Sequence, residues 1–249
     1  MPDYKLRREL AAWREDFTVA AARAQAGGVF TVAELAVGGC LSALSSIRCG
    51  FKHLWTTETD EHKAELAELL TRAPCIGDTF AHDYKQLRAR YGHVSYLKAG
   101  QPCTDYSSPG PHTGRGEGSR TGWMYTAQGQ CILDLQPDVV CLEQVAHIMK
   151  VDKSAVDELI TQLEIHYVVH CAIVNVWRYG DVSNRERLMI VAIHKKFGTM
   201  ATEYSIPEGD FDSDRAPQAW MVACPDDAVP GHLWRTDKII KTAWREPVL

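Results

Sequence analysis

Short apolar runs alternate with stretches of helical spacing along most of the chain, and this alternation limits the folds open to it. The predicted strands are residues 29–35, 51–58, 93–98, 139–142, 167–176 and 187–194. The predicted helices between them include residues 59–70, 123–135 and 153–165, and a further helix follows the glycine turn at Gly38-Gly39. Strands separated by helices of about 10–15 residues predict an α/β fold with a mainly parallel sheet and helices on both faces.

The chain divides into three predicted segments. Residues 1–28 form an N-terminal helix, because apolar side chains recur at helical spacing from Tyr4 to Gln25 and Gly27-Gly28 then stops the helix. Residues 29–197 form the α/β domain. Residues 198–249 form a loop-rich tail or small subdomain, because the periodic pattern gives way to sequence rich in Pro, Asp and Gly.

Composition excludes several classes of protein. The chain of 249 residues has no apolar run of about 18 residues, and its N-terminal segment contains several Arg and Glu residues. We therefore expect an intracellular protein without a membrane segment. The eight cysteines form no CxxC pair, which argues against a zinc site or a disulfide framework. A net charge of -5 leaves the partner open, although a local basic strip would suit a phosphate backbone.

Polar residues gather where the predicted strands end. In an open α/β sheet, ligands bind beyond the carboxyl ends of the strands, so these positions are the first candidates for function. An acidic residue that closes the second strand, here Glu58, suits a pair of ribose hydroxyls. The other positions are Glu34 and Gly38 after the first strand, Asp78 before the third, Cys103 after the third and Glu143 after the fourth.

Three short motifs, taken together, resemble one enzyme family. The sequences QPCTDYS (101–107), VVCLEQV (139–145) and NRERLMIVAI (184–193) are similar to the Pro-Cys, Glu-Asn-Val and Arg-x-Arg motifs of cytosine-5 DNA methyltransferases, in the same order. Upstream, residues 34–60 resemble the methyl-donor segment of that family, and Gly77-Asp78 resembles its Gly-Asp pair. The likeness covers residues 30–197. It implies a Rossmann-like methyltransferase fold, S-adenosyl-L-methionine as cofactor and DNA as substrate.

The resemblance also assigns roles to residues. Glu34, Gly38, Glu58 and Asp78 would bind the methyl donor. In the catalytic set, Cys103 would add to carbon 6 of cytosine, its thiolate favoured by backbone amides of the following turn and by a nearby arginine. Glu143 would hold a proton near ring nitrogen 3, Arg187 would bind the carbonyl oxygen of the base, and Arg185 would position a phosphate or the catalytic loop.

The segment after Cys103 suits a closing element. A duplex hides the target carbon, so the cytosine must be flipped out and held. Residues 109–123 contain glycines that permit hinge motion. We expect Arg115 and Arg120, together with Arg185 and Lys195, to contact phosphates.

Two other functions remain open. The first is methylation of cytosine in RNA, since the same thiolate chemistry serves a flipped RNA base. The second is an inactive binding module, which is supported by Cys40 and Leu41, standing where the family has glycines, and by the missing motifs of the tail. A further departure is Gln144, which stands where the family has asparagine. Residues 198–249 show no clear match to the family's target-recognition region, so a partner chain that supplies target recognition is a further expectation.

Overall fold

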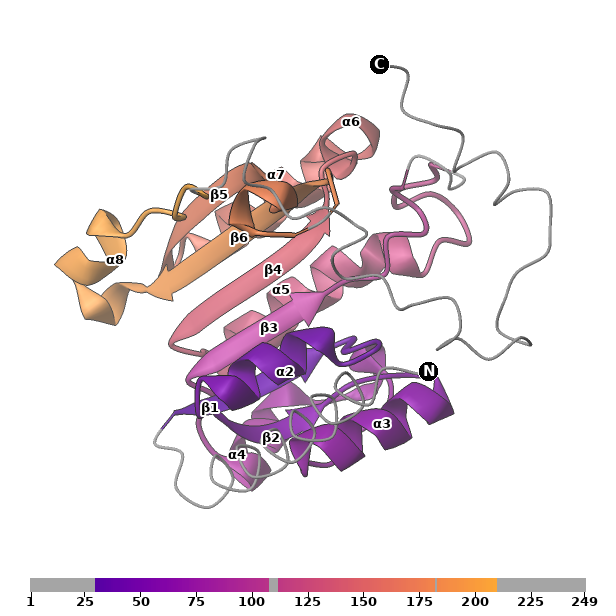
Figure 1. Ribbon diagram of the computed structural model, residues 1–249, viewed down its shortest axis with the longest axis vertical. Coiled ribbons are helices and arrows are strands. Elements are labelled where there is room, and N and C mark those ends of the chain that lie inside the picture. Colours follow the sequence, from indigo (N-terminus) through magenta and orange to yellow (C-terminus); the bar gives the residue numbers. More distant parts are fainter. Residues whose placement is uncertain (1–29, 108–111, 182, 210–249) are drawn as a thin grey trace, which may run out of the picture.

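One sheet of six strands forms the centre of the protein (Figure 1). The computed structural model describes residues 30–107, 112–181 and 183–209. The strand order across the sheet is β2-β1-β3-β4-β6-β5. The strands are β1 (Thr31–Leu35), β2 (Lys52–Thr56), β3 (Tyr96–Gly100), β4 (Val139–Val145), β5 (Tyr167–Asn175) and β6 (Glu186–His194).

A single strand runs against the others. The pairs β1–β2, β1–β3 and β3–β4 are parallel, whereas β6 is antiparallel to both of its neighbours, β4 and β5. The prediction of a mainly parallel sheet is therefore confirmed. The carboxyl ends of β1 to β4 and the first residues of β6 lie at the same edge, which we call the carboxyl edge.

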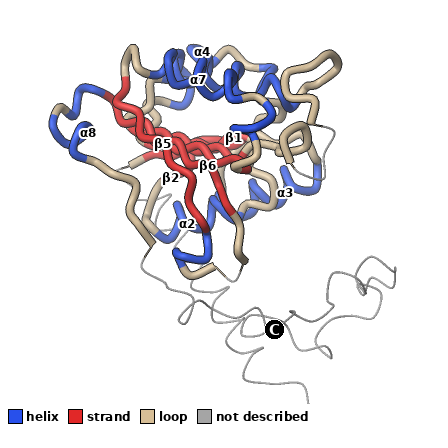
Figure 2. The backbone as a smooth tube through the Cα atoms, turned by 90° about the horizontal axis from the view of Figure 1, so that it is seen from above, coloured by secondary structure: helices blue, strands red, loops and turns tan. Residues whose placement is uncertain are grey.

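Helices cover both faces of the sheet, as predicted (Figure 2). On one face α5 (Met124–Leu135) packs between α4 (Tyr84–Tyr91) and α7 (Lys153–Leu163), and the main apolar core lies beneath these helices. On the other face α2 (Leu41–Arg48) packs against α3 (Glu61–Thr71). The shorter helices are α6 (Ile148–Val151) and α8 (Thr199–Glu203), and the 3-10 turns are Thr79–Ala81, Thr121–Trp123, Val176–Tyr179 and Lys195–Phe197.

Aspartates fix where three of the helices begin. Asp60 accepts a hydrogen bond from the backbone N–H of Lys63 at the start of α3. The side chain of Asp83 likewise accepts backbone N–H groups at the start of α4, and that of Asp152 accepts one at the start of α7. Such caps satisfy backbone donors that have no partner within the helix, and each stabilises its helix by about 1 kcal/mol.

The elements differ from the sequence-based prediction in a few places. β4 continues to Val145, so Glu143 lies within the strand instead of after it. β3 is shifted toward the C-terminus relative to the predicted 93–98. Helix α4 was not predicted, because its sequence is strongly polar and buries only Tyr84 and Leu87, which leaves a weak apolar pattern.

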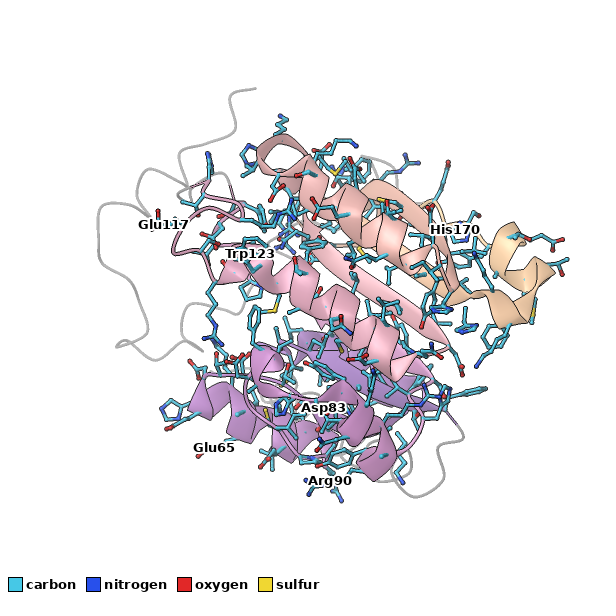
Figure 3. The ribbon with its side chains drawn as sticks, turned by 180° about the vertical axis from the view of Figure 1, so that it is seen from behind. Glu65, Asp83, Arg90, Glu117, Trp123 and His170 are labelled. Atoms are coloured by element: carbon cyan, nitrogen blue, oxygen red, sulfur yellow. The ribbon has the colours of Figure 1, made fainter. Side chains whose placement is uncertain are left out.

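The described part of the predicted tail packs on the outer strand of the sheet. His170 of β5 donates a hydrogen bond from Nε2 to the carbonyl oxygen of Ala201 at 2.8 Å, on the side of β5 next to α8 (Figure 3). The predicted N-terminal helix, residues 1–28, and residues 210–249 of the tail lie outside the described residues. Within the described part of the chain, no helix has the length and apolar character needed to span a membrane.

Candidate functional site

A pocket of about 590 Å³ opens at the carboxyl edge, where β1, β2 and β3 end. Its lining includes four of the residues selected from the sequence: Gly38, Glu58, Asp78 and Cys103. Pro102, Arg120, Thr121 and Met124 also line it. The structure thus brings together residues from four separate loops, as expected for an open α/β sheet.

The carboxylate of Glu58 is held by backbone amides. Its Oε2 accepts the N–H of Gly38 at 2.8 Å, and its Oε1 accepts the N–H groups of Thr59 at 2.9 Å and Asp60 at 3.0 Å. These three bonds tie the end of β2 to the glycine turn after β1. A carboxylate has about four acceptor positions, so Glu58 keeps one for a ligand hydroxyl.

Asp78 and Arg120 form an ion pair at the pocket. The Oδ2 of Asp78 accepts from the guanidinium of Arg120, and its Oδ1 accepts the N–H of Phe80 at 3.0 Å. The Arg120 side chain is 62% exposed and lies 5.1 Å from the centre of the Phe80 ring. This pair links the loop that follows Cys103 to the loop that carries Asp78.

The two residues that replace glycines near the pocket do not line it. Cys40 begins α2 in the left-handed conformation, with φ of 62°, and its side chain is fully buried. Burial raises the pKa of the Cys40 thiol to about 11. Leu41 points to solvent and is 79% exposed. Neither side chain fills the pocket, so these substitutions leave its space intact.

Glu34 does not reach the pocket. It lies within β1, and its buried carboxylate accepts from Ser42 at 2.5 Å and lies 3.0 Å from Nε2 of His53, with Lys98 at 4.0 Å. Burial alone would raise the pKa of Glu34, but the His53 hydrogen bond, the Lys98 charge and the Ser42 hydrogen bond outweigh it and lower the pKa. The structure therefore gives Glu34 the position of a buried tie between β1 and α2, not that of a ligand contact.

Cys103 lines the pocket from the turn after β3. The backbone N–H groups of Tyr106 and Ser107 donate to the carbonyl oxygen of Cys103, at 2.9 and 2.7 Å. These amides were expected to favour the thiolate. Their protons point at the carbonyl instead, so they shape the turn that presents Cys103 and do not serve its sulfur atom.

Glu143 and Arg187 meet across β4 and β6. Arg187 Nε lies 2.6 Å from Glu143 Oε1, and the Arg187 side chain is 19% exposed. Residue 143 pairs with Gly100 of β3, and a Cβ atom placed on Gly100 would come 3.9 Å from Glu143 Oε2. The Glu143 carboxylate therefore lies beside the stretch of chain that leads to Cys103.

Arg185 points elsewhere. Its Nε donates to Ser183 Oγ at 2.9 Å, and its Nη2 lies 3.9 Å from Asp181 Oδ2. Of the two arginines in the Arg-x-Arg motif, the structure brings one, Arg187, to Glu143. Arg185 is 54% exposed at its side chain, so it remains open to an outside contact.

Three buried glutamines join the Cys103 turn to the elements behind it. Gln101 donates to Gln128 of α5 and accepts from Gln144 Nε2 at 3.3 Å, and Gln144 Oε1 accepts the N–H of Val145 at 2.8 Å. Gln144 of β4 thus reaches across to Gln101, directly after β3. The sequence analysis missed Gln101 and Gln128, although Gln101 stands beside Pro102 in the first motif.

Asp105 organises the loop that follows. Its carboxylate accepts from Thr113 at 2.5 Å, from Ser119 at 2.9 Å, from the N–H of Gly122 at 3.1 Å and from Thr121. Burial raises the pKa of Asp105, but these hydrogen bonds outweigh it and lower the pKa. The signal for this role is a lone acidic residue between Cys103 and a stretch rich in Ser, Thr and Gly.

Arg115 and Lys195, which were expected to contact phosphates, make other contacts within the protein. Arg115 is bound to Asp152 at 2.9 Å and to Glu158 at 2.5 Å, and lies 5.7 Å from the ring of Trp123, which Figure 3 labels where α5 begins. Lys195 donates to the carbonyl oxygen of Glu164 at 2.6 Å. Lys195 follows the antiparallel strand β6, so it lies at the edge of the sheet opposite the pocket.

The fold and the pocket define an α/β domain of the methyltransferase type. Solved structures with this fold include an E. coli prophage protein described as a DNA modification methyltransferase, at 20% identity and a TM-score of 0.56, covering 68% of this chain and 47% of that one. The S. pombe Dnmt2 methyltransferase matches at 16% identity and a TM-score of 0.53, covering 71% of this chain and 53% of that one. These likenesses establish the Rossmann-like fold.

The family follows from the sequence as a whole. The model of the C-5 cytosine-specific DNA methylase family matches residues 30–241, and the chain belongs to this family. The match extends beyond residue 197, where the motifs recognised in the sequence end. Type II methyltransferase M.HpaII of Haemophilus parainfluenzae is 29% identical over 177 residues, which is 69% of this chain and 47% of that protein. The chain spans about half the length of the relatives it matches.

Proposed function

We propose that this protein is a DNA (cytosine-5-)-methyltransferase that moves a methyl group from S-adenosyl-L-methionine to carbon 5 of a flipped-out cytosine. The observation that carries the proposal is a single pocket lined by Cys103 together with Glu58 and Asp78, in a chain of the C-5 cytosine-specific DNA methylase family. We call Gly38, Glu58 and Asp78 the donor side of the site, and Cys103, Glu143 and Arg187 its base side.

The donor side has the chemistry that S-adenosyl-L-methionine requires. Glu58 is fixed by three backbone amides and keeps an acceptor position for a ribose hydroxyl. Asp78 offers a second carboxylate to the adenine end once Arg120 moves away from it. Cys40 and Leu41 stay out of the pocket, which favours an active donor site over the inactive module.

The base side has the groups that the reaction at cytosine needs. The Cys103 thiolate adds to carbon 6, and the electron pair of the carbon 5–carbon 6 double bond moves to carbon 5. Glu143 holds a proton at ring nitrogen 3 and offsets the charge that develops on the ring, while Arg187 fixes the Glu143 carboxylate and faces the base carbonyl. The electron pair at carbon 5 then forms a bond to the methyl group that S-adenosyl-L-methionine would supply when bound, and the donor would leave as its neutral thioether. Loss of the carbon 5 proton to solvent and departure of Cys103 then restore the double bond.

DNA is the proposed polymer, and the flipped cytosine would enter beside the loop that Asp105 organises. Arg120 and Arg185 each pair with one carboxylate, but their side chains are more than half exposed and can meet phosphates. Arg115 is mostly buried and bound to two carboxylates. A partner chain that supplies target recognition forms part of the proposal, as the sequence of residues 198–249 suggested.

The test is a covalent trap. The protein is incubated with labelled S-adenosyl-L-methionine and with either duplex DNA or RNA that contains 5-fluorocytosine, because the fluorine prevents the last elimination and leaves Cys103 attached to the base. We expect an adduct with DNA for the wild type and for the control Cys49→Ser, whose cysteine is exposed and outside the pocket, and none for Cys103→Ser. An adduct with RNA alone would show that the substrate is RNA and not DNA. The absence of an adduct with both polymers would favour the inactive module.

A further inference from the structure

The face of the sheet opposite the main core carries an apolar groove. The groove has a volume of about 520 Å³ and runs over β3, β4 and β6. Five of its residues share that face because they alternate along the strands and pair across them: Tyr96, Val139, Cys141, Val191 and Ile193. The groove is distinct from the pocket at the carboxyl edge, and the proposed reaction does not use it.

The same strands are fully covered on their other face. Leu97, Val140 and Ile190 alternate with the groove residues and are completely buried beneath the helices of the main core. On the groove side, α2 and α3 lie over the β1–β2 half of the sheet, and the described residues place no helix of similar length over β4 and β6 (Figure 2). An open apolar groove of this size in the middle of a sheet indicates a missing cover.

The sequence before β1 contains a segment that suits this groove. Phe30, the first described residue, lines the groove and is 61% exposed. Two residues before it, Gly27-Gly28 ends a segment with apolar residues at helical spacing: Leu6, Leu10, Trp13, Phe17, Ala20 and Ala21. A helix over residues 4–25 would be about 33 Å long at about 1.5 Å per residue. The nine residues of β6 extend about 30 Å, so such a helix matches the groove in length.

We propose that residues 4–25 form an amphipathic helix that lies in this groove and completes the second face of the sheet. The other end of the described chain is a poorer source of cover, because Gly209 lies against the backbone of Arg178, beyond the end of β5. Leu10, Trp13 and Phe17 would face Cys141 and its neighbours. Ala12 and Val19 would face solvent, since they lie on the opposite side of a helix with 3.6 residues per turn.

The groove contains its own reporter, the thiol of Cys141. The rate at which N-ethylmaleimide modifies Cys141 in the full chain is measured by mass spectrometry, with exposed Cys49 as the internal reference. The variant Leu10→Glu/Phe17→Glu is compared with Ala12→Glu/Val19→Glu, which adds the same charge to the opposite helix face. We expect the first variant to speed modification of Cys141 by about tenfold or more, since the covering segment would open, and the second to leave it at the wild-type rate.

With folded variants, every other result overturns the proposal. Slow modification of Cys141 in both variants would mean that something else covers the groove, and fast modification in the wild type would mean that the groove is open. Cys131, fully buried in the main core, shows whether a variant has unfolded as a whole. If a glutamate variant has unfolded, cysteine variants are crosslinked with a short bismaleimide instead. Leu10→Cys, Trp13→Cys and Phe17→Cys should each crosslink to Cys141. Ala12→Cys and Val19→Cys should not. Equal crosslinking from both helix faces would reject the proposed arrangement.

Discussion

The two sides of the carboxyl-edge pocket are built by different means. On the donor side, Glu58 accepts three backbone N–H groups from residues close to it in space, and Asp78 accepts one more. On the base side, Glu143 is bound by one side chain, Arg187, which comes from another strand. The donor side thus owes its geometry to local backbone turns, and the base side owes its geometry to the register of β3, β4 and β6.

This difference separates the effects expected from mutation. Under the proposed mechanism, a change on the base side removes a group that acts on the reacting ring, so it should lower the rate and leave donor affinity unchanged. A change on the donor side should lower donor affinity and would also leave backbone amides without acceptors, so it would affect the fold of the turn as well.

The largest effect is expected for Glu143→Gln. An amide keeps the size of the side chain but cannot hold the proton at ring nitrogen 3, and such proton-transfer groups contribute about 10²–10⁴-fold to rates. We expect single-turnover methyl transfer to fall by that amount, with donor affinity unchanged in calorimetry. Glu164→Gln, at the far end of α7, is the control. A Glu143→Gln enzyme with full rate would remove this residue from the proposed mechanism.

A smaller effect is expected for Glu58→Ala. Loss of a hydrogen bond to a charged group costs about 1–3 kcal/mol, so the dissociation constant for S-adenosyl-L-methionine should rise by about 5- to 150-fold. Glu58→Gln should fall between the wild type and Glu58→Ala, because an amide oxygen accepts some of the same N–H groups. If calorimetry gives the same affinity for all three proteins, the donor binds at another part of the molecule.

The smallest effect is expected for Arg120→Ala, which breaks the ion pair between Arg120 and Asp78 that joins the two loops at the pocket. The pair is largely exposed and is worth at most about 1 kcal/mol. Because donor binding at Asp78 would no longer have to displace Arg120, we expect donor affinity to rise by up to about fivefold. Lys63→Ala, which breaks the exposed pair with Asp60 at 3.6 Å, serves as the comparison. A weaker donor complex for Arg120→Ala would show that Arg120 itself holds the donor.

Much of the fold followed from the sequence because apolar periodicity reports burial directly. The alternation of strands and helices predicted the mainly parallel sheet, and positions at the ends of strands predicted Glu58 and Cys103 at the edge where the pocket lies. Asp78, which lies in the turn before β3, lines the same pocket. The same reasoning selected Glu34, which the structure places away from this pocket. It lies within β1, where side chains alternate between faces, and its side chain points under α2 instead of into the pocket.

The contacts that the sequence did not reveal depend on tertiary structure. Asp105 has a defined role only once the following loop folds over it, and Gln101, Gln128 and Gln144 meet only because β3, β4 and α5 are neighbours. Arg115 was expected at a phosphate, but Asp152 and Glu158 of the same chain lie close enough to bind it. Single-residue chemistry predicts which partner a side chain prefers, and packing decides which partner it meets.

The path of the chain after β6 has a consequence for any segment attached beyond residue 209. β6 ends at the edge away from Cys103, but residues 204–209 then return along β5, where Tyr179 donates to the carbonyl oxygen of Pro207 at 2.6 Å and Gly209 lies against Arg178. From β3 to β5 is three strand spacings, or about 14 Å. A segment that continues from residue 209 therefore begins near the strands that carry the pocket. Its local concentration at the pocket would therefore be high, and even weak contacts with DNA would add to those made beside Cys103.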